Sequence, residues 1–215
     1  GQRGKKVALC APTGRAAKRM SEATGEEAKT LHRLLGITGK SFENNEFNPL
    51  EADVIIVDEI SMADIFIFNA LLKAIPPGAK LMLVGDKDQL PSVACGNILS
   101  DMIASKLFCT VYLDEIYRQA KESMIVVNAH RINNSQMPIT KKSKDFFIDN
   151  KVSPNEIKNS VISMAAKRIP NFLDIKPREI QVLSPMKKGV VGVEQLNEEL
   201  QRVLNPSGKE IVYKN

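Results

Sequence analysis

The sequence has no tryptophan, few aromatic residues and only three cysteines. Aromatic side chains make up 5% of the 215 residues, so the core must be built from aliphatic ones. No run of about 18 apolar residues is free of charge, which excludes a membrane-spanning helix and predicts no membrane partner. The three cysteines show no C-x-x-C spacing and are too few for a disulfide scaffold. They favour a reducing, cytoplasmic setting.

A phosphate-binding loop of the form G-x-x-x-x-G-K-[ST] is also absent. The basic segment 1–6 does not form one, because its spacing is too short and no Ser or Thr follows to hold a metal ion. The first residue is Gly rather than Met, and we interpret the sequence as a piece of a longer protein. The formal net charge of +5 is mild and only slightly favours polyanionic partners.

Short apolar runs alternate with helical periodicity along most of the chain, which predicts βαβ units and a mostly parallel sheet. In the first half we expect strands at 7–11, 54–57, 81–84 and 110–113, and helices at 15–23, 26–35, 64–74 and from about 96. In the second half we expect helices at 123–132, 155–168 and 193–204, and strands at 145–148 and 180–183. A domain boundary is expected near 112–118.

Two acidic residues, Asp58 and Glu59, directly follow the apolar run 54–57. Such a run delivers them to the carboxyl edge of a parallel sheet, where ligands bind in open α/β folds. Adjacent acids are costly there unless a cation or a proton transfer requires them. One interpretation is a nucleotide-hydrolysis site in which Asp58 holds Mg²⁺ through its water shell and Glu59 activates the attacking water. The alternative is a pair of surface acids that cap the following helix.

Gln89 follows the next predicted strand within the loop 85–93. If the two strands are neighbours, Gln89 emerges at the same sheet edge as Asp58 and Glu59. Its amide could then donate to a γ-phosphate and accept from water. The alternative is an ordinary turn, since Gly, Asp and Pro are common turn residues.

Several segments resemble, in their family order, the motifs of superfamily 1 DNA helicases. The resemblance is greatest to the RecD-like branch, which includes the alpha subunit of exodeoxyribonuclease V. Segments 57–62 and 84–93 resemble motifs II and III. Segments 11–20, 30–35 and 113–119 resemble motifs Ia, Ib and IV, and 181–186 also looks RecD-like.

This resemblance implies an α/β fold of the P-loop NTPase (RecA-like) type, with a parallel sheet flanked by helices. Residues 1–113 would form a nearly complete first motor domain without its phosphate loop. Residues 114–215 would form part of a second RecA-like domain, because nothing resembles motifs V and VI.

The resemblance also implies roles for single residues at an ATP site. Asp58 would hold Mg²⁺ through its water shell, and Glu59 would activate the attacking water. Gln89 would sense the γ-phosphate. Arg118 would act as an arginine finger, and Tyr117 would pack near the adenine or within a core. ATP and Mg²⁺ are expected only in the full-length protein, since the piece alone should bind ATP poorly and not hydrolyse it.

A second set of residues is expected to contact DNA. Arg15, Lys18 and Arg19 share one helical face that begins near Thr13, a plausible N-cap. The resemblance implies a DNA-binding set of Thr13, Arg15, Lys18, Thr30, His32, Arg33 and Lys187. The alternatives are a solvated basic face and, for His32, a core histidine.

The implied function is that of part of an ATP-dependent DNA helicase, which couples hydrolysis to movement on single-stranded DNA and to duplex unwinding in repair or recombination. Single-stranded and duplex DNA are the expected partners, together with possible further subunits of a nuclease–helicase complex. Three alternatives stay open: a non-catalytic DNA-binding or scaffold module, a helicase segment of a conjugative relaxase, and a P-loop ATPase that acts on protein.

Overall fold

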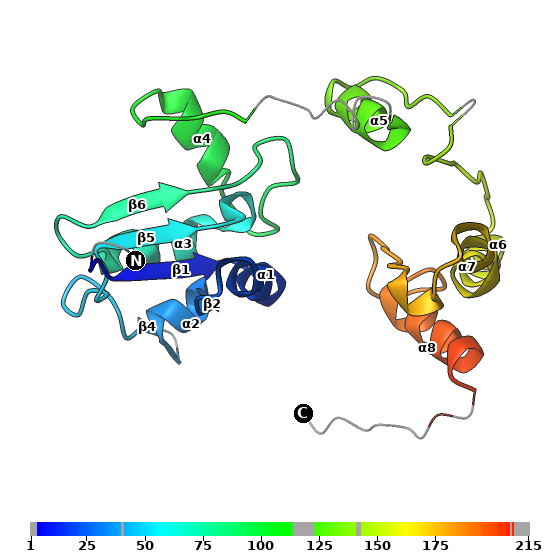
Figure 1. Cartoon of the computed structure of the whole chain (residues 1–215), viewed down its shortest axis with the longest axis horizontal. Coiled ribbons are helices and arrows are strands. Elements are labelled where there is room, and N and C mark those ends of the chain that lie inside the picture. Colours follow the sequence, from blue (N-terminus) through cyan, green and yellow to red (C-terminus); the bar gives the residue numbers. More distant parts are fainter. Residues whose placement is uncertain (1–3, 40, 114–122, 141–142, 207, 209–215) are drawn as a thin grey trace. The chain divides into compact units, whose positions relative to one another are not determined.

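The computed structural model describes residues 4–39, 41–113, 123–140, 143–206 and 208. It divides the chain into two compact units, residues 1–118 and residues 119–215 (Figure 1). Among the described residues, no helix combines the length and the apolar character needed to cross a membrane.

The first unit is built on a sheet of four parallel strands in the order β2-β1-β5-β6 (Figure 1). The strands are β1 (Val7–Ala11), β2 (Ala28–Thr30), β5 (Val54–Val57) and β6 (Lys80–Leu83). Since all four run in the same direction, their carboxyl ends lie along one edge of the sheet. A two-stranded antiparallel pair, β3 (Ile37–Thr38) and β4 (Ser41–Phe42), lies outside this sheet.

Helices flank the sheet and pack with it in one hydrophobic core that includes β5. They are α1 (Gly14–Thr24), α2 (Leu31–Leu35), the 3-10 turn Ile60–Met62, α3 (Ile65–Ala74) and α4 (Ile98–Ser105). Ile55 and Val57 of β5 are fully buried and join Leu31, Leu35 and Leu71 in the core cluster. The predicted parallel sheet flanked by helices is therefore confirmed.

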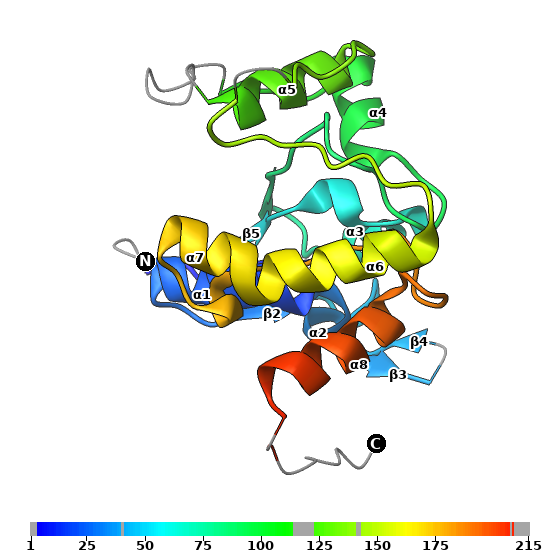
Figure 2. The same cartoon turned by 90° about the vertical axis from the view of Figure 1, so that its right-hand side faces the viewer.

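The second unit is helical in its described part. It contains α5 (Met124–Asn133), α6 (Pro154–Ser163), the π-helical segment Met164–Arg168, α7 (Ile169–Leu173), the 3-10 turn Pro177–Glu179 and α8 (Val193–Leu204). Figure 2 shows α6 and α7 joined end to end through the π-helical segment. An ion pair of 3.6 Å between the Lys158 ammonium and the Glu199 carboxylate links α6 to α8.

Several predicted elements are wrong. The helix expected over 26–35 is split, because residues 28–30 pair with β1 as strand β2 and only Leu31–Leu35 is helical. Residues 110–113, 145–148 and 180–183 form no strand. A strand needs a hydrogen-bonded neighbour, and the structure pairs none of these segments with another strand in its described part. Asp145 instead accepts hydrogen bonds from the Ser123 hydroxyl and the Met124 N–H at the start of α5.

Candidate functional site

The predicted site residues of the first unit follow the carboxyl ends of its four strands. Thr13 and α1 follow β1, and Thr30 is both the last residue of β2 and the N-cap of α2. Asp58 and Glu59 follow β5, and the loop that contains Gln89 follows β6. The strand order therefore places the expected DNA contacts on the β2–β1 half of the edge and the expected nucleotide contacts on the β5–β6 half.

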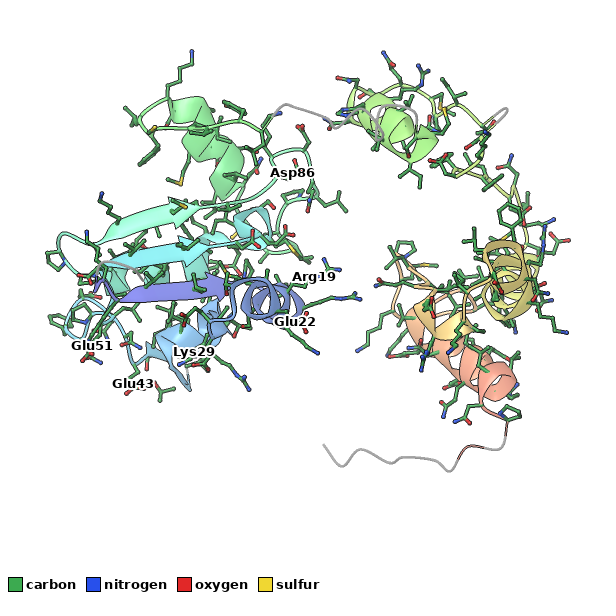
Figure 3. All side chains as sticks on the ribbon, viewed as in Figure 1. Arg19, Glu22, Lys29, Glu43, Glu51 and Asp86 are labelled. Atoms are coloured by element: carbon green, nitrogen blue, oxygen red, sulfur yellow. The ribbon has the colours of Figure 1, made fainter. Side chains whose placement is uncertain are left out.

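Figure 3 shows where labelled charged residues of the first unit lie along the direction of the strands. Asp86, after β6, and Arg19, on α1, lie toward the carboxyl end of the strands, whereas Glu51 lies at the opposite end. Asp86 and Arg19 therefore lie at the end of the first unit where the strand ends that precede both candidate sets are found.

The acid turn, residues Asp58 and Glu59, is held in a specific backbone conformation. The Asp58 N–H donates to the Cys10 carbonyl at 2.9 Å, and the Asp58 Oδ1 accepts from the Glu59 N–H at 2.9 Å. Glu59 has φ 52° and ψ 37°, the left-handed region, which costs a residue with a side chain about 1 to 2 kcal/mol. The fold holds this strained residue at the end of its central strand, where strain is often tied to function.

The chemistry of the acid turn fits a magnesium ion. Both carboxylates are half-buried, and Oδ1 of Asp58 is used by the backbone while its second oxygen has no hydrogen bond to the described residues. Among those residues there is also no group of three side chains suited to a metal cage. Mg²⁺ is commonly bound by one or two carboxylates with water and phosphate oxygens, rather than by a complete protein cage.

The Gln89 loop begins beside the acid turn. The Val84 N–H donates to the Val57 carbonyl at 2.8 Å, and the Ile60 N–H donates to the Val84 carbonyl at 3.0 Å. Gln89 is exposed, and its N–H donates to the Asp86 carbonyl at 3.3 Å within the loop. Asp58, Glu59 and the Gln89 loop therefore leave the sheet from neighbouring strand ends.

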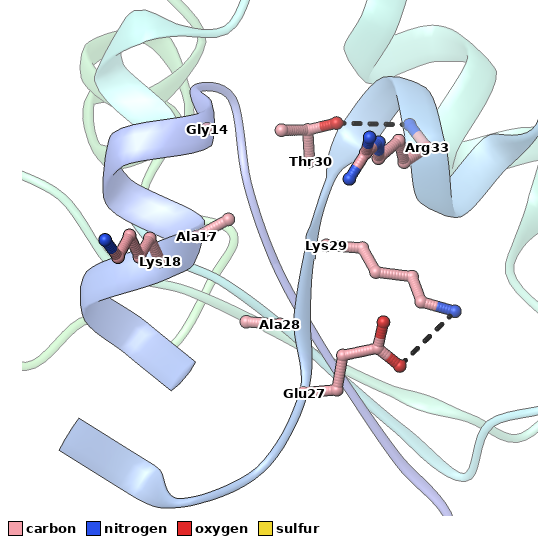
Figure 4. A pocket seen from close by; sticks show the side chains of 8 residues that line it. All are labelled: Gly14, Ala17, Lys18, Glu27, Ala28, Lys29, Thr30 and Arg33. Atoms are coloured by element: carbon pink, nitrogen blue, oxygen red, sulfur yellow. Dashed lines mark hydrogen bonds and ion pairs between the residues drawn. The ribbon is translucent and has the colours of Figure 1, made fainter. Parts of the chain in front are cut away.

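A basic pocket of about 400 Å³ lies between α1, β2 and the start of α2 (Figure 4). Its charged lining consists of Lys18, Lys29 and Arg33, with Glu27 as the single acid. The Lys29 ammonium is 3.7 Å from the Glu27 carboxylate, and the Lys18 ammonium is 3.8 Å from that of Glu22. The Arg33 guanidinium has no ion pair with any residue that the structure describes. The pocket carries a net positive charge suited to phosphate.

Two threonines border this region as helix caps. The Thr13 Oγ1 accepts from the Ala16 N–H at 3.3 Å, as the predicted N-cap requires, and the Thr30 Oγ1 accepts from the Arg33 N–H at 3.2 Å. A hydroxyl that accepts in a cap can still donate its own proton to an anion. Both side chains therefore keep a donor for a phosphate oxygen.

The remaining predicted residues are distributed as follows. Arg15 is exposed on α1, and His32 is exposed with its ring centre 6.4 Å from that of Phe42, so His32 is not a buried core histidine. Lys187 belongs to the second unit, where its ammonium is 3.8 Å from the Glu194 carboxylate. Tyr117 and Arg118 lie outside the described residues.

Sequence reasoning missed Lys29, which lines the basic pocket. Lys29 directly precedes Thr30, an expected DNA contact, and this position could have indicated it. Residues 26–35 were instead predicted to form a helix. As a strand beside α1, residues 28–30 all line the pocket, although the Lys29 side chain leaves β2 on the side opposite to Ala28 and Thr30 (Figure 4).

Comparisons with known proteins agree with the motifs. A family model described as an AAA domain matches residues 1–95. The chain is 38% identical to the ATP-dependent RecD2 DNA helicase of Deinococcus radiodurans over 94% of this chain and 27% of that protein. It is 43% identical to the RecBCD enzyme subunit RecD of Mycolicibacterium smegmatis over 46% of this chain and 21% of that protein. The chain thus spans about a quarter of the length of these relatives.

A solved structure that describes DNA unwinding at forked duplexes by two coordinating Pif1 helicases is also similar. It shares 24% sequence identity with a TM-score of 0.42, and the match covers 78% of this chain and 43% of that one.

Proposed function

The similarity to RecD-like helicases predicted from the motifs is confirmed, and from it we propose that the chain forms part of an ATP-dependent DNA helicase. One observation carries the proposal: a single sheet edge has the acid turn and the Gln89 loop on one half and the basic pocket on the other. A motor that moves on DNA needs both sites, joined by a rigid element. Here β1 and β5 are hydrogen-bonded neighbours, and they end in α1 and in the acid turn.

On the nucleotide half, we assign Glu59 as the base that orients and deprotonates the attacking water. Asp58 would hold Mg²⁺ through water with its free carboxylate oxygen, and the ion would supply neutralising charge to the phosphates when bound. Gln89 would meet the γ-phosphate through its amide. From the resemblance we also assign Arg118 as an arginine finger and Tyr117 as an adenine neighbour.

On the DNA half, we assign the basic pocket to backbone phosphates of single-stranded DNA, one for each of its three cations. Lys18, Lys29 and Arg33 would supply charge, and the hydroxyls of Thr13 and Thr30 would supply neutral donors. Figure 4 shows Lys29 on β2 and Arg33 on α2, the helix that directly follows this strand. Further phosphate contacts are assigned to Arg15, His32 and Lys187, all of which belong to the expected DNA-binding set.

The whole protein would convert hydrolysis into movement along single-stranded DNA and unwinding of duplex DNA, with a role in repair or recombination. Since the smegmatis relative is named as a RecBCD subunit, association with further subunits of a nuclease–helicase complex is part of the proposal. The three cysteines are free, and Cys95 and Cys109 are exposed, which suits a reducing cytoplasm.

Substitution of Glu59 in the full-length protein tests the nucleotide half. Glu59→Gln keeps the size of the side chain and one acceptor oxygen but removes the base, so DNA-stimulated ATP turnover should fall by about 100-fold or more. Nucleotide affinity should stay within about twofold of the unsubstituted protein, because the base contributes to the transition state rather than to binding.

Glu51→Gln is the matched control, because Glu51 is exposed at the other end of the sheet, and this variant should keep full turnover. Normal turnover by Glu59→Gln would remove Glu59 from its assigned role. DNA binding without any ATP turnover in the unsubstituted full-length protein would favour the non-catalytic module instead.

A further inference from the structure

The Gln89 loop is attached at both of its ends to the segment that follows the acid turn. At its start, the Ile60 N–H donates to the Val84 carbonyl at 3.0 Å. At its end, the Ile65 N–H donates to the Cys95 carbonyl at 3.0 Å. Residues 85–95 therefore span two backbone hydrogen bonds to residues 60–65, the stretch that begins directly after Glu59.

A glycine lies next to each attachment. A Cβ at Gly85 would be 3.0 Å from Cδ2 of Leu99 and 3.3 Å from the backbone N of Ile60. A Cβ at Gly96 would be 3.0 Å from the backbone N of Ile65, and the φ of Gly96 is +123°, a value that side chains disfavour. Both attachments therefore depend on the close approach that glycine permits.

The loop also has internal order between its attachments. The Asp88 N–H donates to Oδ1 of Asp86 at 2.9 Å, and the Gln89 N–H donates to the Asp86 carbonyl at 3.3 Å. Lys87 forms an ion pair with Asp88 at 2.7 Å. On the other side, the buried Ser61 hydroxyl has no hydrogen-bond partner among the described residues, so it adds nothing to the attachment. Two backbone hydrogen bonds thus join the ends of the loop to residues 60–65.

We propose that Gly85 and Gly96 are positioning residues that make the Gln89 loop and the acid turn move as one body. The proposal rests on the function assigned above to Glu59 and Gln89. With both attachments intact, a shift of Gln89 toward a phosphate is transmitted to Glu59 through residues 60–65. A side chain at either glycine separates the two segments and misplaces the base relative to the loop.

Amide hydrogen exchange in the chain tests the attachment without reference to catalysis. The Ile60 and Ile65 amides should be protected, and Gly96→Ala should speed the exchange of Ile65 by about tenfold or more. Gly78→Ala is the matched control, because Gly78 also has a positive φ of +84° but a Cβ there would meet nothing within 4 Å. Equal exchange of Ile65 in both variants, or an unprotected Ile65 amide in the unsubstituted chain, would overturn the proposal.

Steady-state kinetics of the full-length protein test the positioning role. Gly96→Ala should lower kcat for ATP by about tenfold or more while KM changes by less than about twofold, since a misplacement near 1 Å can cost about 100-fold. Gly78→Ala should keep its kcat. An unchanged kcat in Gly96→Ala with faster Ile65 exchange would overturn the positioning role and leave the proposed function intact. Normal turnover by Glu59→Gln would instead refute the proposed function.

A compensating pair covers the case in which Gly96→Ala does not fold. Gly85→Ala should lower kcat because its Cβ presses on Leu99 and on the Ile60 backbone. Adding Leu99→Ala removes the nearest contact, so the double variant should recover part of the lost kcat even though it also loses packing. A double variant with a lower kcat than Gly85→Ala would contradict the proposal, because loss of stability alone predicts that order.

Discussion

The basic pocket makes the most direct quantitative prediction about DNA. Replacing Lys18, Lys29 and Arg33 together by Gln removes all three positive side chains that line it. The ion pairs of Lys18 and Lys29 are long, at 3.8 and 3.7 Å, and solvent-exposed. Such pairs contribute about 0 to 1 kcal/mol, so both lysines are available to neutralise phosphate.

The expected magnitude follows from counterion release. Each neutralised phosphate of single-stranded DNA contributes about −0.7 to the slope of log affinity against log salt. The slope of the triple variant should therefore be shallower by about 2. Between about 50 and 200 mM salt, the unsubstituted chain should therefore lose roughly 20-fold more affinity than the variant. Fluorescence anisotropy with a short labelled oligothymidylate measures both slopes.

The control variant removes the same number of positive charges from another part of the first unit. Lys6, Lys73 and Lys80 lie away from the carboxyl edge: Lys6 precedes β1, Lys80 begins β6, and Lys73 pairs with Glu46. Replacing these three by Gln also lowers the formal net charge from +5 by three, to +2. If the two triple variants shift the slope equally, total charge rather than the pocket accounts for binding. If neither shifts it, the pocket does not bind DNA.

Two further predictions test the burial of one side chain in each unit. Burial raises the pKa of the Cys10 thiol to about 12, so at pH 8 a thiol reagent should label the exposed Cys95 and Cys109 quickly and Cys10 only after denaturation. Equal labelling rates for all three in the native chain would show that Cys10 is not buried. In the second unit, the buried Asn128 amide donates to the Ile139 carbonyl at 2.8 Å and accepts from its N–H at 2.7 Å. Asn128→Ala should lower the free energy of unfolding by about 1 to 3 kcal/mol in urea titrations. The exposed Asn133→Ala should have a much smaller effect, and equal effects would contradict the assigned role of Asn128.

The acid turn is a part of the site that the local sequence predicts. Four consecutive β-branched residues followed by Asp58 and Glu59 predict a covered strand with acids at its carboxyl end, and β5 has those bounds. Thr13 as a helix cap was equally predictable, because a cap involves residues only a few positions apart.

Strand β2 shows where this reasoning fails. Its residues, Ala28–Thr30, are three in number and carry no alternation of apolar and polar side chains that would distinguish a strand from a helix. They become a strand because they pair in parallel with β1, in register with Leu9, Cys10 and Ala11. For the converse reason, residues 110–113 are mostly apolar but form no strand, since they pair with no other strand in the described part of the chain.

The sequence by itself determined strands β1, β5 and β6 and helices α1 and α3 of the first unit, the acids at the end of β5 and the motifs that reveal the RecD-like character. These depend on neighbours within a few positions of the chain. Only the tertiary structure decided the strand order that places β2 and β1 beside β5, the left-handed backbone of Glu59 and the contacts of Gly85 and Gly96. Each of these arises from hydrogen bonds and packing between segments that are distant in the sequence, so no local pattern encodes it.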